Sequence, residues 1–349
     1  MKNSIVIFRQ GSLGDTVVSL PVFEEIKRRY PDKDLVLLTA YRNNPEIIPT
    51  EKILVRANLI KKVIKYREGV RNISDLFNVI KEIRKERIHK CFYLMPRKRK
   101  RDVVRDAVFL RACGIREIIG LPLTDRDLHC QDIGNGLVEF EGNRLYRAVF
   151  LTDMPQDLGQ TPLFEVSDLE YVLNIIRRSN FNSDKLVVVS VNSKMTTKNW
   201  SLQAWQKVLL EISRRHERHI CFVGAMSDAD FVEQVVQALP DGYLNFCGQL
   251  SLEQSAALIS LCELFIGVDS GPMHIANYLH KPLVGLFSAR DVPGKWYPQG
   301  AKAHILQGEA ECSKCMLEDN CPNDNICMKS ISPSILIEKV ENLLKVELS

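Results

Sequence analysis

Two separate series of short apolar runs alternate with helix-like segments, and this alternation limits the possible folds more than any other feature. The first series opens with an Ile- and Val-rich run at residues 4–9, a helix-like segment at 15–30 and a second apolar run at 35–39. The second series contains apolar runs at 186–191, 220–223, 264–268 and 283–287. Runs of this kind, separated by helices, are typical of buried parallel strands in α/β domains.

The length and the two series together predict two domains. The chain has 349 residues, and a domain typically has about 100–200. Residues 120–165 are less regular and hold several Gly and Pro, so we place the end of the first domain there. We expect two Rossmann-like domains, residues 1–165 and 166–331, that face each other across a cleft. A helix within residues 332–349 could pack back on the first domain.

Charge and hydropathy exclude some classes of protein. The formal net charge is +4, from 47 Lys and Arg against 43 Asp and Glu, which is too small to indicate nucleic acid binding. The apolar run near the N-terminus is too short for the core of a signal peptide, and no run approaches the roughly 20 apolar residues that cross a bilayer. We therefore expect a cytoplasmic protein, which could still contact a membrane surface.

The turn at residues 11–15 (GSLGD) joins the first predicted strand to its helix. Such a turn directs backbone N–H groups and the positive end of the helix toward the carboxyl edge of the sheet. Asp15 would be exposed to a ligand at that edge, although an ordinary helix-capping Asp explains the same pattern. The turn is not GxGxxG and no Walker lysine follows, so the sequence does not favour a dinucleotide site or a P-loop.

A second junction, residues 268–274 (VDSGPMH), ends an apolar run and opens a helix. The free N–H groups of the first helical turn would suit a phosphate, with His274 about one turn into the helix. A generic strand-to-helix junction capped by Asp269 or Ser270 is the alternative interpretation.

A polar loop, residues 192–200, follows the first strand of the second domain and contains Lys198 and Trp200. Lys198 could neutralise a departing diphosphate. A solvated surface lysine is the alternative.

Taken together, these three segments resemble glycosyltransferase family 9, which contains the ADP-heptose:lipopolysaccharide heptosyltransferases. The family motifs are similar to residues 9–15, to the loop with Lys198 and Trp200, and to residues 269–276 followed by the apolar run at 283–287. The segments occur in the order and domain positions of the family, and the resemblance covers nearly the whole chain. It implies a GT-B fold, with the acceptor bound by the first domain and the nucleotide sugar by the second.

The resemblance also implies an inverting, metal-independent transfer without a cofactor. Asp15 would be the general base, and Lys198 would stabilise the departing ADP. The implied donor contacts are Ser193, Lys194, Asp228, Leu250, Asp269, Ser270, Gly271 and His274. Among these, Asp228 matches a position that binds ribose hydroxyls, and Leu250 matches one that packs on adenine. Acceptor contacts are expected at Ser12, Gly14, Arg97, Arg99 and Arg101.

A basic run, residues 97–101, follows a predicted strand and lies at an edge of the first domain. It could bind an anionic acceptor, such as a phosphorylated lipid anchor or acidic core sugars, at the anionic inner leaflet. A solvated charged surface is the alternative. Nucleic acid is not expected, because no aromatic residues are interleaved with the basic ones.

Four cysteines, Cys312, Cys315, Cys321 and Cys327, lie within 16 residues and could bind structural Zn²⁺. Their spacing differs from the common CxxC…CxxC ribbon, and reduced thiols are the alternative. Disulfides are less favoured in a cytoplasmic protein. A catalytic role is not expected, because the family chemistry needs no thiol.

The leading hypothesis is transfer of heptose from ADP-heptose to a lipid-linked, anionic lipopolysaccharide core acceptor at the cytoplasmic face of the inner membrane. A family 9 enzyme that uses another nucleotide sugar is one alternative. A non-enzymatic, metal-stabilised protein that binds an anionic surface is the other, and the presence of Asp15, Lys198 and Asp269 together argues against it.

Overall fold

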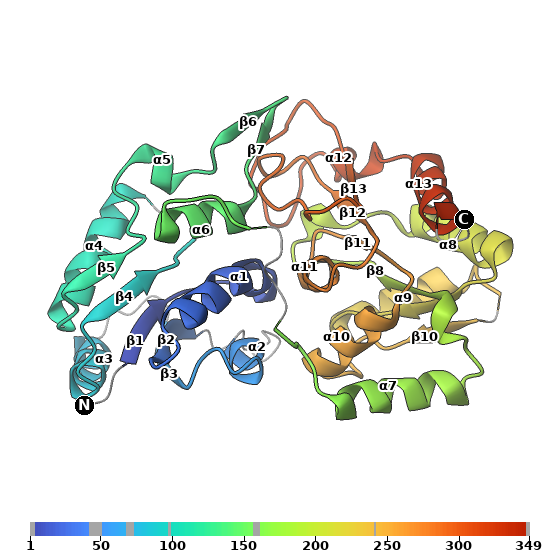
Figure 1. The fold of residues 1–349 in the computed structure, drawn as a ribbon. Coiled ribbons are helices and arrows are strands. Elements are labelled where there is room, and N and C mark those ends of the chain that lie inside the picture. Colours follow the sequence, from blue (N-terminus) through green and yellow to red (C-terminus); the bar gives the residue numbers. More distant parts are fainter. Residues whose placement is uncertain are drawn as a thin grey trace. The chain divides into compact units, whose positions relative to one another are not determined.

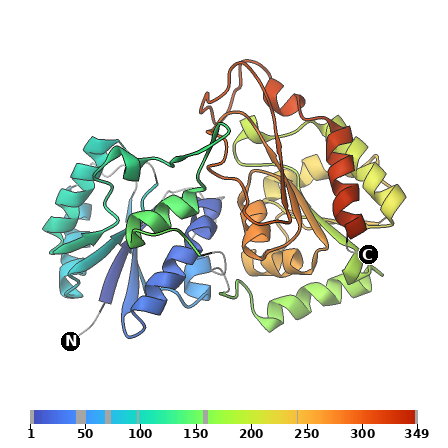
Figure 2. The same ribbon diagram turned by 45° about the horizontal axis from the view of Figure 1, so that its top comes forward.

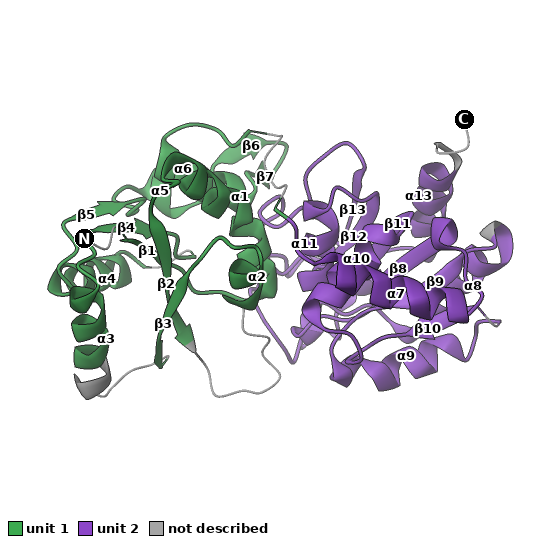
Figure 3. Ribbon diagram, turned by 60° about the horizontal axis from the view of Figure 1, so that its bottom comes forward, with its two compact units in different colours: residues 1–161 green, residues 162–349 purple. Residues whose placement is uncertain are grey.

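The chain folds into two compact α/β units, Met1–Thr161 and Pro162–Ser349 (Figures 1 and 3). The computed structural model describes residues 4–41, 51–67, 73–96, 99–155, 161–240 and 242–346. Each unit contains a parallel sheet with helices packed on it, which confirms the predicted α/β class with two Rossmann-like units. That the units face each other across a cleft stays a prediction. None of the helices within the described ranges has the length and apolar character that a membrane span requires.

The main sheet of unit 1 has five parallel strands in the order β3-β2-β1-β4-β5. Its strands are β1 (Ser4–Phe8), β2 (Asp34–Tyr41), β3 (Lys62–Arg67), β4 (Lys90–Tyr93) and β5 (Glu117–Ile119). Its helices are α1 (Leu13–Arg29), α2 (Glu51–Arg56), α3 (Ile73–Lys85), α4 (Lys100–Ala112), α5 (Asp125–Leu128) and α6 (Glu141–Phe150), and β6 (Asp132–Gly134) pairs with β7 (Leu137–Val138). Val6 of the buried central strand lies opposite Val36 and Cys91, so β1 and β4 end side by side.

Helix α6 lies within the stretch that the sequence indicates to be less regular. It packs on α1 and buries Leu145 and Val149. A Cβ at Gly142 would lie 3.1 Å from the carbonyl oxygen of Val18 in α1. The glycine that suggested a loop therefore permits a close contact between two helices.

The sheet of unit 2 has six parallel strands in the order β10-β9-β8-β11-β12-β13. Its strands are β8 (Leu186–Ser190), β9 (His219–Phe222), β10 (Tyr243–Asn245), β11 (Leu264–Val268), β12 (Leu283–Phe287) and β13 (Ala303–Gln307). Its α-helices are α7 (Val166–Arg178), α8 (Leu202–His216), α9 (Ala229–Val236), α10 (Leu252–Leu261), α11 (Gly271–Tyr278), α12 (Ile326–Lys329) and α13 (Pro333–Val346). Three short 3₁₀ turns are η1 (Ser183–Lys185), η2 (Thr196–Lys198) and η3 (Met226–Asp228). The order reverses beside β8, so the loops after β8 and β11 meet at the point where such sheets bind ligands.

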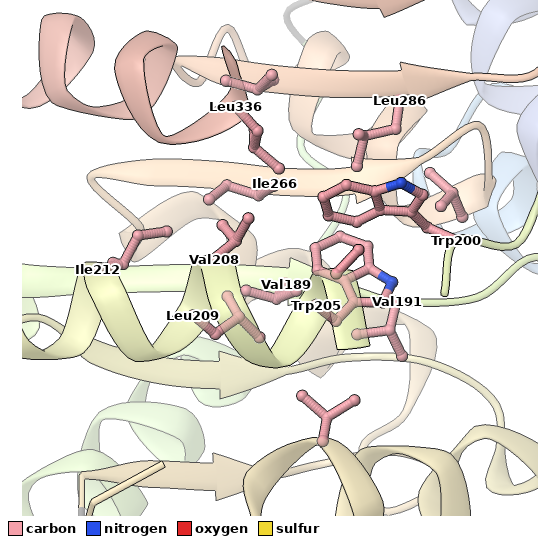
Figure 4. Close-up of a cluster of buried hydrophobic side chains, with 14 of the residues drawn as sticks. Val189, Val191, Trp200, Trp205, Val208, Leu209, Ile212, Ile266, Leu286 and Leu336 are labelled. Atoms are coloured by element: carbon pink, nitrogen blue, oxygen red, sulfur yellow. The ribbon is translucent and has the colours of Figure 1, made fainter. Parts of the chain in front are cut away.

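Helix α13 packs on α8 and completes the core of unit 2 (Figure 2, red beside yellow). Its Leu336 lies in the same buried cluster as Trp200 and Trp205, whose rings meet edge to face with centroids 5.2 Å apart (Figure 4). A contact of this helix with the first domain stays a prediction. An amphipathic helix needs one apolar partner, and unit 2 supplies it.

Candidate functional site

Lys198, Asp269 and His274 form a buried cluster in unit 2. Asp269 directly follows β11, Lys198 ends the η2 turn after β8, and His274 lies in α11. Lys198 Nζ is 2.6 Å from Asp269 Oδ2, and His274 Nε2 is 3.5 Å from Asp269 Oδ1. The three side chains are only 11%, 7% and 5% exposed, so the alternative of a solvated surface lysine is wrong for Lys198.

The cluster favours an ionised Asp269. Burial alone would raise the pKa of Asp269, but the charge of Lys198 and the hydrogen bond from His274 outweigh burial and hold that pKa well below its usual value. Burial and the charge of Asp269 raise the pKa of the nearby Tyr297 to about 12. The fixed carboxylate holds the Lys198 ammonium in place, and an ammonium has two further N–H donors that can bind a ligand.

Helix α11 begins beside this cluster with a first turn that its N-cap side chain does not cap. In the part of the chain that the structure describes, the side chain of Ser270 accepts no hydrogen bond from the helix. Its Oγ lies instead 3.3 Å from Oγ of Ser190, the last residue of β8. The backbone N–H groups of Gly271 and Met273 are therefore suited to an anion, which the helix dipole also favours; Pro272 between them has no N–H.

Three residues around the cluster are absent from the sequence-based predictions: Ser190, Trp296 and Tyr297. The Trp296 ring meets the His274 ring edge to face with centroids 6.2 Å apart, and its Nε1 donates to Asp291 Oδ2 at 2.9 Å. His274 Nδ1 is buried and has no hydrogen-bond partner among the described residues, so it can bond to a ligand. The position of these residues in the sequence could have indicated them. Ser190 ends β8, the two aromatic residues follow β12, and both strands belong to the same parallel sheet.

Asp228 lies in the η3 turn that follows β9, the neighbour of β8. Its Oδ2 accepts from Ala225 N at 2.8 Å. Burial raises the pKa of Asp228, although hydrogen bonds from Ala225 and Asn192 oppose the increase. Gly224 permits this arrangement, because a Cβ there would lie 2.5 Å from Asp228 Oδ2. The predicted contact with ribose hydroxyls stays a prediction.

The other predicted donor contacts have mixed surroundings. Ser193 N donates to Asn199 Oδ1 at 2.7 Å, so Ser193 shapes the loop that carries Lys198. Lys194 is exposed, and Leu250 is half-buried just before α10. Their contacts with a nucleotide stay predictions.

Asp15 in unit 1 forms a capping box with Ser12 at the start of α1. Ser12 N and Oγ donate to Asp15 Oδ2 at 2.7 and 2.6 Å. A Cβ at Gly11 would lie 2.5 Å from the Asp15 Cβ, and Gly14 is buried in the first turn. The capping interpretation of Asp15 is therefore confirmed. Capping also fixes the orientation of its carboxylate, which remains 22% exposed at the sheet edge.

A buried arginine supports Asp15 from inside unit 1. Arg9 Nη1 donates to Leu94 O and its Nη2 to Asp15 O, both at 2.7 Å, and this Nη2 is 3.9 Å from Asp15 Oδ1. Burial lowers the pKa of Arg9, while the charges of Asp15 and Glu141 oppose that decrease. Glu141 also pairs with the buried Arg144 at 2.6 Å. These three residues have no role among the sequence-based predictions, because the contacts of Arg9 with Leu94 and of Arg144 with Met95 join segments far apart in the chain.

The predicted basic run is only partly described. Arg97 and Lys98 lie outside the described residues. Arg99 precedes α4, and Arg101 is exposed in its first turn. Lys100 pairs with Asp125 at 2.9 Å. Contacts of Arg97, Arg99 and Arg101 with an acceptor stay predictions.

The four clustered cysteines do not form the predicted zinc site. Within the described ranges, no group of three or more His, Cys, Asp or Glu side chains is placed to hold a metal ion. Cys312 and Cys315 are exposed, Cys321 is half-buried and Cys327 is buried, and all four are free thiols. The backbone of the CxxC turn is held elsewhere, because Lys314 N donates to Ala289 O at 2.6 Å.

Solved structures of similar fold show that the two units have the GT-B fold. The structure is similar to a family 9 glycosyltransferase from Veillonella parvula, with a TM-score of 0.72 and 18% identity over 98% of this chain and 97% of that chain. It is also similar to ADP-heptose lipopolysaccharide heptosyltransferase II from Escherichia coli, with a TM-score of 0.69 and 18% identity over 99% of this chain and 100% of that chain. The expected GT-B fold is confirmed.

The chain belongs to glycosyltransferase family 9, because the family model described as "Glycosyltransferase family 9 (heptosyltransferase)" matches residues 101–326. It is 28% identical over 154 residues to lipooligosaccharide heptosyltransferase 2 of Campylobacter jejuni, which covers 43% of this chain and 48% of that relative. The chain thus spans about half the length of that relative. It is 23% identical to lipopolysaccharide heptosyltransferase 3 of Escherichia coli over 292 residues, 80% of this chain and 81% of the relative.

Proposed function

We propose that this protein transfers heptose from ADP-heptose to an acceptor in the lipopolysaccharide core. The observation that carries the proposal is the buried Lys198–Asp269–His274 cluster beside the uncapped first turn of α11. A cation, free backbone N–H groups and a positive helix end meet there, which suits a diphosphate. The family and the named heptosyltransferase relatives support the choice of sugar.

The donor diphosphate binds at the start of α11, where the N–H groups of the helix contact phosphate oxygens. Lys198 neutralises the negative charge that grows on ADP as the bond to the sugar breaks. Asp269 keeps the lysine ammonium in position. His274 donates or accepts through its unpaired Nδ1 at the sugar or the phosphates.

Asp15 is the general base. Its carboxylate takes the proton from an acceptor hydroxyl as the hydroxyl oxygen attacks the anomeric carbon and the bond to the ADP oxygen breaks. Attack from the face opposite to the leaving group inverts the configuration, and no step in this scheme requires a metal ion. The capping box and Arg9 hold Asp15 in one orientation, and general base catalysis needs such a fixed geometry.

The acceptor is a lipid-linked anionic saccharide, contacted by Ser12, Gly14 and the basic residues Arg97, Arg99 and Arg101. The reaction takes place at the cytoplasmic face of the inner membrane. Basic residues attract anionic lipid headgroups as well as an anionic acceptor.

Calorimetric binding of ADP, UDP and GDP tests the donor half of the proposal. We expect ADP to bind selectively and to bind at least about 10-fold more weakly to Lys198→Ala, because a charge-assisted contact is lost. Lys185→Ala, at a lysine of the same unit whose side chain is 40% exposed, is the control. Preference for UDP or GDP would overturn the assignment of ADP-heptose as the donor. If none of the three nucleotides binds, a non-enzymatic protein would be favoured.

Transfer by Asp15→Asn tests the catalytic half. The amide cannot accept the proton, so the turnover with ADP-heptose should fall by about 100-fold or more while ADP affinity is unchanged. The amide oxygen of Asn can still accept the hydrogen bonds from Ser12 N and Oγ, so the variant should fold normally. A variant with wild-type turnover would show that Asp15 is only a capping residue.

A further inference from the structure

The segment 316–319, between the clustered cysteines, runs against the η2 turn that carries Lys198. Asp319 Oδ1 accepts from Thr196 N at 3.0 Å and from Thr196 Oγ1 at 2.8 Å. Thr197 Oγ1 lies 2.8 Å from Leu317 O and 3.0 Å from Glu318 O. Both residues of η2 that precede Lys198 are therefore bonded to a segment more than a hundred positions away along the chain.

The Thr197 contact is part-buried, whereas the Asp319 contact is exposed. Thr197 is only 3% exposed, and its backbone N–H also donates to Glu318 O at 3.3 Å. A hydrogen bond that water reaches less easily is stronger than an exposed one, and Thr197 bonds to the segment through both its hydroxyl and its backbone N–H. Thr197 is thus the stronger of the two attachments.

The segment is itself held by elements of the sheet. Buried Arg290, which follows β12, donates through Nη2 to Met316 O at 3.0 Å and through Nε to Leu317 O. Met316 N donates back to Arg290 O at 2.9 Å. Asn325, just before α12, donates to Thr196 O at 2.9 Å. The segment therefore joins the loop after β12 to the η2 turn after β8, and both loops contribute to the cluster around Asp269.

We infer that residues 316–319 are a positioning element that holds Lys198 for donor binding through Thr196 and Thr197. The expected effect on donor binding rests on the proposed function. The positioning of Lys198 can be tested without a donor. The backbone of η2 fixes where the long Lys198 side chain starts, and a lysine has four rotatable side-chain bonds that disorder it when its backbone moves. A mobile Lys198 would contact both Asp269 and a diphosphate less often.

Acetylation of Lys198 with an amine-reactive ester, followed by mass spectrometry, tests the positioning directly. Lys198 should react slowly in the wild type because it is buried and ion-paired. In Thr197→Val we expect Lys198 to react about 3- to 10-fold faster, because the free energy of one hydrogen bond corresponds to a change of that size. Thr197→Ser retains the hydroxyl and should restore the wild-type rate. Lys185 is the internal reference.

Two further variants separate positioning from general destabilisation. Asp319→Ala removes the surface attachment and carries the test if Thr197→Val fails to fold. Asp324→Ala is the control, because this exposed carboxylate lies five residues beyond Asp319 and pairs with Lys329. Equal acetylation of Lys198 in the wild type, Thr197→Val and Asp319→Ala would overturn the inference.

ADP affinity gives the functional measurement. Added to the wild-type chain, Thr197→Val should weaken ADP binding about 3- to 10-fold. Added to Lys198→Ala, it should have no further effect, because both substitutions act through Lys198. Equal weakening in both backgrounds would overturn the inference. If the wild type binds no nucleoside diphosphate, the proposed function fails, while the acetylation rates still decide whether the segment positions Lys198.

Discussion

Replacing Lys198 by Met is expected to destabilise unit 2 and to change how its stability depends on pH. Lys198 and Asp269 are paired at 2.6 Å, with side chains 11% and 7% exposed. Met has an unbranched stem but no charge, so the buried carboxylate loses its cation. Removal of one partner of a buried ion pair typically costs about 3–5 kcal/mol. Because this pair is slightly exposed, we expect the lower end of that range, about 3 kcal/mol.

The pH dependence follows from the direction of each pKa shift. In the wild type, folding lowers the pKa of Asp269, so the pair stabilises the folded state above the unfolded pKa of about 3.9. That stabilisation is lost as the pH falls through the lower folded value. In the variant, burial without Lys198 raises the folded pKa, and the resulting destabilisation disappears as the pH falls through that raised value. The deficit should therefore be large at about pH 7 and smaller at about pH 5.

Urea unfolding followed by tryptophan fluorescence measures this deficit in unit 2 alone. All three tryptophans of the chain, Trp200, Trp205 and Trp296, lie in that unit. Lys185→Met is the matched control, because the Lys185 side chain is 40% exposed and its Nζ lies 3.6 Å from Glu217 Oε2. An exposed pair of that kind contributes less than about 1 kcal/mol. If both variants lose the same stability, or if the Lys198→Met deficit is equal at both pH values, the reasoning is refuted.

Two further substitutions test the packing of unit 2. Trp205 is fully buried, so Trp205→Ala should lower the free energy of unfolding, measured by calorimetry, by about 3–5 kcal/mol. A loss below about 1 kcal/mol would contradict the packing shown in Figure 4. A Cβ at Gly308 would lie 2.0 Å from Cys327 O, so Gly308→Ala should displace α12 and lower the stability by about 1–3 kcal/mol. An unchanged melting temperature in Gly308→Ala would mean that the two backbones are not in close contact.

The apolar runs predict most of the central strands, because a strand buried on both faces must be apolar throughout. The runs at β1, β8, β11 and β12 are of this kind, and the polar residues after them, including Asp269, lie at the predicted edge. Residues at strand ends were therefore the predictable part of the site.

Contacts between distant segments could not be predicted from local pattern. Arg9 looks like an ordinary charged residue after a strand, and only the fold brings it to the Leu94 carbonyl. The apolar face of α13 indicates burial but not the partner, since any apolar surface would satisfy it. The four cysteines have a spacing that suits a metal, yet the backbone of their segment is bonded to Ala289, Arg290 and Thr197 instead.

The contribution of α13 to the core of unit 2 also affects the order of folding during synthesis. Unit 1 ends at Thr161, so its sheet can assemble while the second half of the chain is still being translated. Unit 2 cannot close its core until Leu336, Val340 and Leu344 have emerged from the ribosome. Until then the apolar face of α8 is uncovered on the nascent chain. Chaperones that bind exposed apolar segments can therefore bind this face until α13 covers it.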